Sequence, residues 1–368
     1  MPHKLLFTGD VVLASKPEFS AAFQELFDGQ HIRCCNFEAP LEGIGAPIRK
    51  TGPLVNQSAL AAEWLKELGF DLFAIANNHI ADYGSQALLN TRERLGDRCT
   101  FGAGTREEAY QMLVREIQGV KYGFVAYAEN GYGALSEDQE VGYAWVNHKR
   151  ITADLKNFKE QVDLLIVQVH AGVEMVEVPI PEWRERYRQL VDSGADAVVA
   201  HHPHVLQGME YYKEKPIFYS LGNFYFDGIS NRDDWKIGGA LELRAESGKI
   251  TGYTMHVIEK SGTLVSLMEE GRADNLFASL NAKLGDETAY LAYVDKIAEQ
   301  QWKNHHIQYY QKGINGLVVY NLKAIAKHFK RLIFNRGVDY SMLWHNTMIE
   351  SNLWIVQRAI KKINRERE

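Results

Sequence analysis

The sequence predicts a layered α/β domain followed by a region built of helices. Three observations lead to this fold class. Short apolar runs that are rich in β-branched residues alternate with segments of helical spacing over the first 258 residues. Most of the strand-like runs stop at a carboxylate, amide or imidazole side chain. Helical spacing then continues from Glu259 onward, where glycine becomes sparse. We therefore expect two domains, at residues 1–258 and 259–368.

Local signals place the elements of the first domain in order. Strands are expected at residues 5–13, 31–37, 70–76, 119–127, 162–169, 195–200 and 216–221. Helices are expected between them, at residues 17–27, 58–68, 85–95, 152–161 and 181–193. Ser58 and Gly69 are typical of the start and the end of a helix, and Pro181 suits a first helical turn. Alternating polarity over residues 238–258, with a turn at Ser247-Gly248, predicts a hairpin.

Charge is distributed unevenly between the two predicted domains. The whole chain carries a net charge of -6. From Glu259 onward there are 16 basic and 12 acidic residues, so the 25 basic and 35 acidic residues before it give the first domain a net charge of -10. An acidic chain without a known nucleic-acid-binding motif argues against a nucleic-acid partner. Cys34, Cys35 and Cys99 do not form a disulfide framework in number or spacing.

The chain shows no targeting or spanning signal. Its first strand begins almost at once, without the apolar stretch of a secretory leader, and no run approaches the roughly 20 apolar residues that cross a membrane. These features predict a cytoplasmic protein.

Polar side chains recur where the predicted strands end. Three histidines lie within His201-His202-Pro203-His204, directly after an apolar strand, and the proline restricts the backbone between two of them. Other strand ends supply Asp10, Asn36, Glu38, Asn78, His79 and His170. Because the carboxyl ends of parallel strands lie at one edge of a sheet, we expect these side chains to meet there.

This set of donors suits metal-assisted hydrolysis. Carboxylate, amide and imidazole ligands together favour Mn, Fe or Zn over Ca. They can hold two divalent cations, and a carboxylate shared between the cations offsets their repulsion. Such a pair lowers the pKa of a bridging water toward about 7, so that hydroxide can attack phosphorus. His79 can then either protonate the leaving oxygen or stabilise charge on the phosphoryl group. Taken singly, Asp10 has the alternative role of a helix N-cap, Glu38 that of a surface residue and His170 that of a core residue.

Seven segments of the chain match the motifs of one known family, and they occur in the same order as in that family. They include Phe7-Thr8-Gly9-Asp10, Asn36-Phe37-Glu38-Ala39-Pro40, Ala76-Asn77-Asn78-His79, Phe101-Gly102-Ala103-Gly104, Val169-His170-Ala171-Gly172, His201-His202-Pro203-His204 and Leu221-Gly222-Asn223-Phe224. In these segments, which span roughly residues 4–258, the chain resembles the CapA family of bacterial capsule synthesis proteins. That family is linked to poly-γ-glutamate capsule production and is a divergent branch of the calcineurin-like metallophosphoesterases.

The resemblance implies a four-layer α/β/β/α sandwich with a dinuclear metal centre at the strand ends. By position it implies the metal ligands Asp10, Glu38, Asn78, His170, His202 and His204. His79 would be the catalytic histidine, beside the ligating amide of Asn78. We expect the substrate to contact Asn36, Glu174, His201 and Asn223. The chain departs from general phosphoesterases at Val12, which replaces a histidine, and at Glu38, which replaces a bridging aspartate.

Two functional hypotheses follow from this resemblance. The first is a metal-dependent phosphoesterase of capsule or poly-γ-glutamate biosynthesis, which acts on a phosphorylated sugar, a lipid-linked substrate or a nucleotide. The alternative is a capsule assembly protein without phosphatase activity, whose metal site binds the carboxylates of an anionic polymer.

The second domain contains a basic amphipathic segment. Helices are expected at residues 275–284, 287–304, 317–335 and 340–364. Residues 312–338 hold six basic residues and no acidic one, with apolar residues at helical spacing among them. Such a helix can lie on an anionic membrane surface. The alternative is a helix that packs on the catalytic domain and leaves its charged face in solvent.

Overall fold

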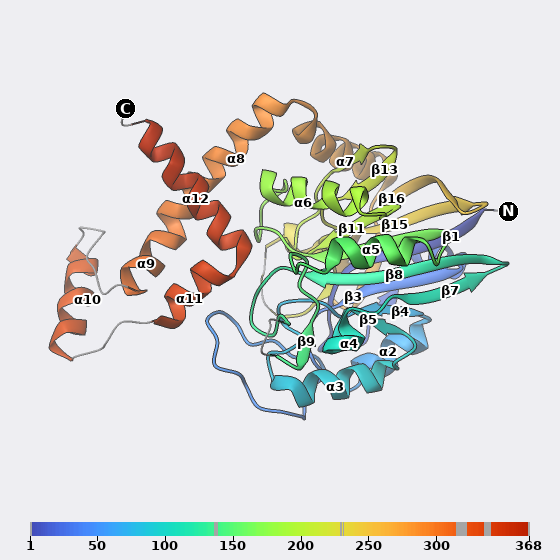
Figure 1. The fold of residues 1–368 in the computed structure, drawn as a ribbon, viewed down its shortest axis with the longest axis horizontal. Helices are drawn as coiled ribbons and strands as arrows, with labels where there is room; N and C mark the ends of the chain where they lie inside the picture. Colours follow the sequence, from blue (N-terminus) through green and yellow to red (C-terminus); the bar gives the residue numbers. More distant parts are fainter. Residues whose placement is uncertain are drawn as a thin grey trace. The chain divides into compact units, whose positions relative to one another are not determined.

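The structure is a computed structural model in which the chain divides into two compact units (Figure 1). It describes residues 2–135, 139–228, 230, 232–313, 322–334 and 340–366. Unit 1 comprises Met1–Ile48 and Leu54–Asp286, and unit 2 comprises Arg49–Pro53 and Glu287–Glu368.

Unit 1 is built around a nine-stranded sheet whose central strand is β1 (His3–Val12). Strand β1 lies between antiparallel β15 (Ile237–Glu246) and parallel β3 (Ile32–Phe37), and β14 (Asn223–Phe226) pairs in parallel with its end. Nearly every residue of β1 is buried, as expected for a strand that is covered on both faces. The remaining strands are β2 (Glu18–Phe19), β4 (Leu72–Ala74), β5 (Thr100–Phe101), β16 (Lys249–Ser261) and β17 (Leu264–Leu267).

A second sheet of six strands faces the first. Its centre consists of the parallel strands β8 (Val120–Ala128), β10 (Leu164–His170) and β11 (Ala197–His201). The other strands are β7 (Leu113–Ile117), β12 (Met209–Tyr212) and β13 (Lys215–Phe218). All residues of β10 and β11 are buried, which agrees with the mostly apolar sequences before their terminal histidines. A separate two-stranded ladder pairs β6 (Ala103–Thr105) with β9 (Val141–Tyr143).

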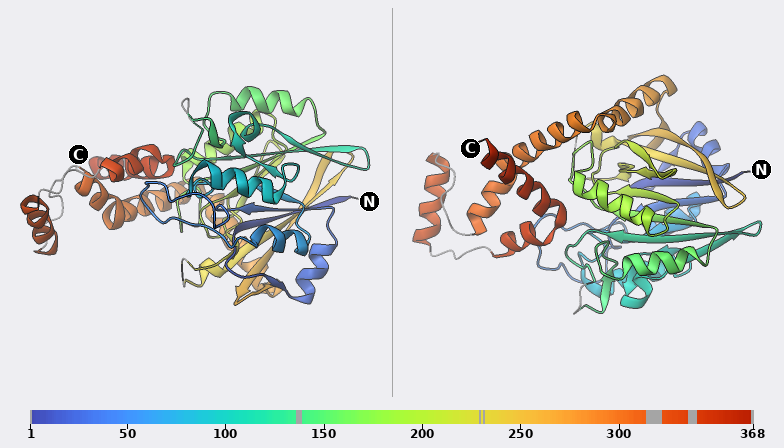
Figure 2. Two further views of the ribbon diagram at one scale, coloured as in Figure 1. Left: turned by 90° about the horizontal axis from the view of Figure 1, so that it is seen from below. Right: turned by 45° about the horizontal axis from the view of Figure 1, so that its top comes forward.

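The two sheets pack face to face and share one apolar core. The rings of Phe7 in β1 and Phe124 in β8 lie 6.4 Å apart, and Ile166 and Val199 of the second sheet belong to the same buried cluster as Leu241 of the first. Helices cover the outer faces, with α1 and α2 on the first sheet and α5 and α6 on the second (Figure 2). The helices of unit 1 are α1 (Ala21–Asp28), α2 (Ala61–Leu68), α3 (Gly84–Leu95), α4 (Arg106–Ala109), α5 (Ile151–Lys159), α6 (Pro181–Asp192) and α7 (Glu270–Gly285). The predicted α/β/β/α sandwich is thus confirmed.

Unit 1 extends beyond the predicted boundary at residue 258. Strand β16 continues to Ser261, β17 pairs with it, and α7 then packs against β12 and β16. Asn281 of α7 accepts a hydrogen bond from the backbone N–H of Met209 at 2.8 Å. The predicted hairpin is present as β15 and β16, but it is the start of a longer antiparallel extension.

Apart from Arg49–Pro53, unit 2 is mostly helical in its described residues. Its helices are α8 (Glu287–Gln301), α9 (Ile307–Gly313), α10 (Leu322–Ile333), α11 (Tyr340–Met348) and α12 (Glu350–Arg365), with a π-helical turn at Trp302–His306. Helices α8 and α12 bury apolar faces and are joined by ion pairs from Asp295 to Arg358 and from Glu299 to Lys362. Part of the predicted helix at 317–335 lies outside the described residues, and the predicted helix at 340–364 is divided into α11 and α12.

A membrane-spanning helix requires a certain length and apolar character. Among the helices that the structure describes, none has both the length and the apolar character to cross a bilayer.

The sheet register brings polar strand ends together. Asp10 of β1 is paired with Asn36 of β3 on one side and with Asn223 of β14 on the other, and His170 of β10 is paired with His201 of β11. The register of β1 shifts at Asp10 against both neighbours, which marks a bulge. Bulges redirect a side chain, and here the redirected side chain is Asp10.

Gly9 is required next to this bulge. A Cβ atom at Gly9 would lie 2.0 Å from the carbonyl oxygen of Gly222, so the backbone would have to move. The N–H of Asp10 donates to that same oxygen at 2.9 Å. The close approach of these two backbones therefore sets the position of Asp10.

We predict that Gly9→Ala lowers the free energy of unfolding by about 1–3 kcal/mol, the usual effect of overpacking a close-packed site. Denaturant unfolding of the purified protein measures this change. Gly285→Ala is the matched control, because its Cβ would meet no neighbouring atom and glycine is unfavourable in a helix. Equal stabilities of the two variants would contradict the steric role of Gly9.

Candidate metal centre

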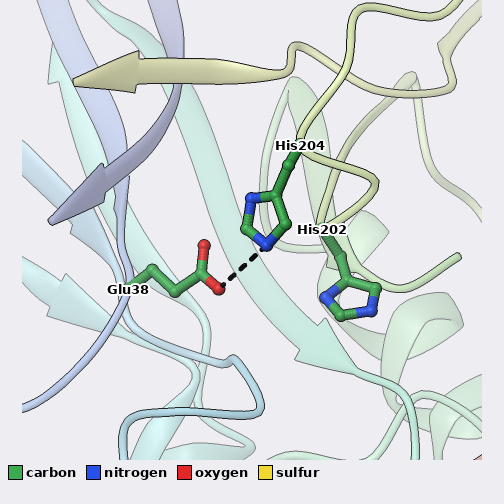
Figure 3. Close-up of side chains that lie close together, drawn as sticks. All are labelled: Glu38, His202 and His204. Carbon is green, nitrogen blue, oxygen red and sulfur yellow. Dashed lines mark ion pairs between the residues drawn. The ribbon is translucent and has the colours of Figure 1, made fainter. Parts of the chain in front are cut away.

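Carboxylate and imidazole side chains from both sheets converge in the interior of unit 1. Asp10 and Glu38 come from the ends of β1 and β3, and His170, His202 and His204 come from the ends of β10 and β11. All five are buried, with at most 5 % of their surface exposed. Figure 3 shows Glu38 and His204 facing each other, with the ring of His202 beside them. The predicted convergence of these residues is therefore present in the structure.

These residues form two groups that fit a metal ion. Glu38, His202 and His204 make up one group, and Asp10, Glu38 and His170 make up the other. Within each group, one ligand atom from each residue lies within 4.8 Å of the others. Glu38 belongs to both groups, as a carboxylate shared between two cations would. Mixed carboxylate and imidazole donors suit Mn, Fe or Zn.

The environment of Glu38 supports this fit. Both of its carboxylate oxygens are buried, and neither has a hydrogen-bond partner among the residues that the structure describes. Its Oε1 lies 3.6 Å from Nε2 of His170 and 3.7 Å from Nε2 of His204. A buried carboxylate is stable only when it is paired, coordinated or protonated. A divalent cation between these side chains would satisfy both oxygens.

Asn78 completes the donor set near His170. Its Oδ1 lies 2.9 Å from Nε2 of His170, and that nitrogen lies 3.0 Å from Nδ1 of His202. Three atoms that can each offer a lone pair thus meet at short range. Asn78 itself is half-buried, so it stands at the more open side of the cluster.

The backbone is strained where it presents the histidines. His202 and His204 have φ angles of 96° and 57°, in the left-handed region that non-glycine residues rarely adopt. The N–H of His202 donates to Oδ2 of Asp10 at 3.2 Å, and the N–H of Met175 donates to the carbonyl of Pro203 at 2.9 Å. These contacts hold the turn in a conformation that directs both rings inward. Strain of this kind is concentrated at functional sites.

Charge interactions within the cluster set the protonation of its members. Burial raises the pKa of Glu38 well above its usual value, and the neighbouring charge of Asp10 raises it further. Burial also raises the pKa of Asp10, but hydrogen bonding and charge from His204 outweigh this effect and lower it. The pKa of His204 is raised to about 10, because the carboxylates of Glu38 and Asp10 outweigh the effect of burial.

The other histidines of the cluster are held neutral. Burial lowers the pKa of His201 and of His202 to about 4, and it also lowers that of His170 well below the usual value. Neutral imidazole is the form that binds metals. These rings are therefore in the protonation state of a ligand at neutral pH.

His79, the predicted catalytic histidine, is fixed by a carboxylate. Its Nδ1 lies 2.7 Å from Oδ2 of Asp82, and both side chains are buried. The same oxygen of Asp82 accepts a hydrogen bond from the N–H of Val55 at 2.8 Å, and Oδ1 of Asn77 accepts from the N–H of His79 at 3.2 Å. This geometry orients the imidazole and leaves Nε2 as the ring nitrogen that does not contact Asp82.

Three of the four predicted substrate-binding residues contact the candidate ligands in the structure. The amide of Asn36 donates to Oδ1 of Asp10 at 2.8 Å and lies 3.0 Å from Nδ1 of His170. Asn223 Oδ1 lies 2.9 Å from Nδ1 of His204. His201 lies 3.6 Å from Asp10 through Nδ1 and 3.0 Å from Gln168 through Nε2. Their burial and partners favour an orienting role over substrate contact.

Glu174, the fourth predicted substrate residue, is exposed at the rim of the cluster. Its charge adds to the rise in the pKa of Glu38 and opposes the lowering of the pKa of His202, so it lies within electrostatic range of both. It is the member of the predicted substrate set that solvent reaches most readily.

Sequence reasoning missed several residues around the cluster. Oε1 of Glu129 lies 3.4 Å from Nε2 of His202, Asp82 contacts His79, and the indole of Trp235 lies tilted against the His204 ring with their centroids 4.7 Å apart. Glu129 directly follows the apolar strand β8, so it carries the same strand-end signal as the residues that were found. Asp82 lies in the turn after His79 and Trp235 in a short 3-10 helix (Asp234–Lys236), and no sequence spacing assigns a role to either of them.

Two proteins of known family are similar to this chain in sequence. Capsule biosynthesis protein CapA of Bacillus anthracis is 33% identical over 171 residues, which cover 44% of this chain and 42% of that protein. PGA biosynthesis protein CapA of Bacillus subtilis (strain 168) is 31% identical over 168 residues, which cover 44% of each. This chain therefore matches less than half the length of either relative.

Among solved structures, a putative 5'-nucleotidase from Staphylococcus aureus in complex with alpha-ketoglutarate has a TM-score of 0.47 and 13% identity, over 77% of this chain and 58% of that one. A similarity of this extent identifies no function. The model of the family described as bacterial capsule synthesis protein PGA_cap matches residues 4–228, more than half of the chain and nearly all the strand ends described above. The chain belongs to this family of bacterial capsule synthesis proteins.

Proposed function

We propose that the chain is a metal-dependent phosphoesterase that acts in capsule or poly-γ-glutamate biosynthesis. The observation that carries the proposal is the position of Glu38, whose buried carboxylate belongs to both candidate ligand groups. The pair of Asp82 and His79 beside this centre supports an acid–base step. Family membership supports the biosynthetic context.

Two roles in the reaction would fall to residues of the chain: metal binding and proton exchange. Divalent cations bound here would polarise a phosphoryl oxygen and lower the pKa of water. Asp10 and Glu38 would hold the cations together with His170, His202, His204 and Asn78. Because Asp82 holds Nδ1 of His79, proton exchange with the leaving oxygen would take place at Nε2.

A second candidate function rests on the family and not on the geometry. The relatives from two Bacillus species are named as capsule or PGA biosynthesis proteins. A polymer of glutamate carries a row of carboxylates, and carboxylate oxygens bind the same cations as phosphate oxygens do. The same centre would then bind polymer ends without hydrolysing a phosphate ester.

We predict that the purified chain binds Mn or Zn in stoichiometric amounts and that Asp10→Asn and His202→Ala weaken this binding at least about tenfold. The expected loss is at least as large as that for residues that merely support metal ligands. Elemental analysis after dialysis against a limiting metal concentration measures the bound ion. His305→Ala is the control, because this histidine is exposed and belongs to unit 2. Wild-type protein without bound metal would refute the proposal.

We predict that the metal-loaded chain hydrolyses members of a panel of phosphomonoesters and phosphodiesters. His79→Gln should lower kcat about 10²–10⁴-fold, the usual contribution of a general acid, without changing the metal content. His31→Gln is the control, because His31 is exposed and precedes the opposite end of β3. Full activity of His79→Gln would exclude the assigned role. Absence of hydrolysis across the panel would favour the polymer-binding alternative.

We predict that inorganic phosphate competes for the metal-loaded centre and that poly-γ-glutamate does not. Fluorescence competition against a bound phosphate analogue separates the two candidate functions, since both ligands are anionic but only one has tetrahedral phosphoryl geometry. Asp10→Asn should reduce phosphate binding. Displacement of the analogue by the polymer, with phosphate ineffective, would reverse the order of the two proposals.

A further inference from the structure

Helix α10 exposes a continuous apolar stripe. Leu322 is 87% exposed, Ile333 75% and Phe329 57%. These residues are separated by seven and four positions, so they lie on one side of the helix, and half-buried Ile325 falls on the same side. Large apolar side chains at such exposures are unusual in a soluble protein when they are contiguous, and they mark an interaction surface.

One flank of this stripe is basic. Lys323, Lys327 and Lys330 are all exposed, and helical spacing places them together beside the apolar residues. No acidic residue occurs in the sequence from 312 to 338. The surface that covers α10 must therefore be both apolar and negatively charged.

A second copy of α10 fits this description poorly. Two such helices packed through their apolar stripes would bring like-charged lysines close together, and their segments offer no carboxylate to pair with them. A lipid bilayer with anionic headgroups has an apolar layer of acyl chains directly beneath a negatively charged layer of headgroups. The lysine side chains are long enough to reach the headgroups while their stems lie along the acyl boundary.

We infer that α10 lies in the plane of an anionic phospholipid surface, with Leu322, Ile325, Phe329 and Ile333 in the acyl boundary and the three lysines at the headgroups. A helix that lies in the plane of the surface makes a peripheral contact. Helix α11 adds an independent observation. Tyr340 and Trp344, one helical turn apart, are 71% and 58% exposed. Exposed tyrosine and tryptophan are typical of the interfacial layer of a membrane.

The test is sedimentation of the full chain with vesicles of phosphatidylcholine alone or mixed with phosphatidylglycerol. We expect binding to the mixed vesicles that weakens as salt is added, because exposed charges are screened. The triple variant Lys323→Gln, Lys327→Gln, Lys330→Gln should bind the mixed vesicles on the order of 100-fold more weakly. Its control, Lys121→Gln, Lys156→Gln, Lys249→Gln, removes three exposed lysines of unit 1 and should bind as the wild type does.

The apolar stripe is tested separately. Phe329→Gln with Ile333→Gln should weaken binding more than about tenfold, since both side chains would leave the acyl boundary. Leu60→Gln with Tyr211→Gln, at exposed apolar positions of unit 1, is the control. Circular dichroism checks that the helical content of each variant is unchanged.

Three outcomes would overturn the inference. One is absence of binding to the mixed vesicles, which would favour packing of α10 within the protein. Another is equal binding to neutral and anionic vesicles that does not respond to salt. The third is a concentration-dependent dimer, seen without vesicles, that the Phe329→Gln and Ile333→Gln exchanges abolish. In that case the stripe is a contact between copies of the chain.

Discussion

The carboxylate of Glu38 is the constraint on which the candidate centre depends. Both of its oxygens are shielded from solvent, without a donor among the described residues, and the carboxylate of Asp10 is near enough to raise its pKa. An uncompensated charge in such surroundings is unfavourable by several kcal/mol. The ionised form of Glu38 therefore requires positive charge in the cluster, and protonated His204, which lies near both carboxylates, meets that requirement in part.

The centre exists only in the packed sandwich. The first sheet supplies Asp10 and Glu38, and the second supplies His170, His202 and His204. Asn36 of the first sheet contacts His170 of the second, so one amide links the sheets at the level of the candidate ligands. Residues behind the ligands, such as Asn223 and Glu129, then restrict the orientation of individual rings. The donor set is consequently complete only when the two sheets are packed against each other.

Much of this arrangement was predictable because strand ends are marked in the sequence. The apolar run before His201 and the one before His170 both end where the structure ends β11 and β10. The direction of each side chain was not predictable, since a shift of one residue turns a strand's side chains to the other face. His201 is an example: the sequence places it among the substrate contacts, and in the structure its ring nitrogens lie 3.6 Å from Asp10 and 3.0 Å from Gln168. The change in composition at Glu259 predicts a boundary there, whereas β16 runs through that residue to Ser261 and unit 1 extends to Asp286, because a strand can continue through a change in composition.

The left-handed backbone of His202 and His204 has a consequence for the evolution of this fold. Each such residue raises the energy of the folded chain by about 1–3 kcal/mol relative to a glycine in the same place. Glycine at either position would relax the turn and make the protein harder to unfold, yet it would delete a donor from the interior. Histidine is present at these two left-handed positions although glycine would give a more stable protein, so the donor nitrogens of the rings outweigh the loss of stability.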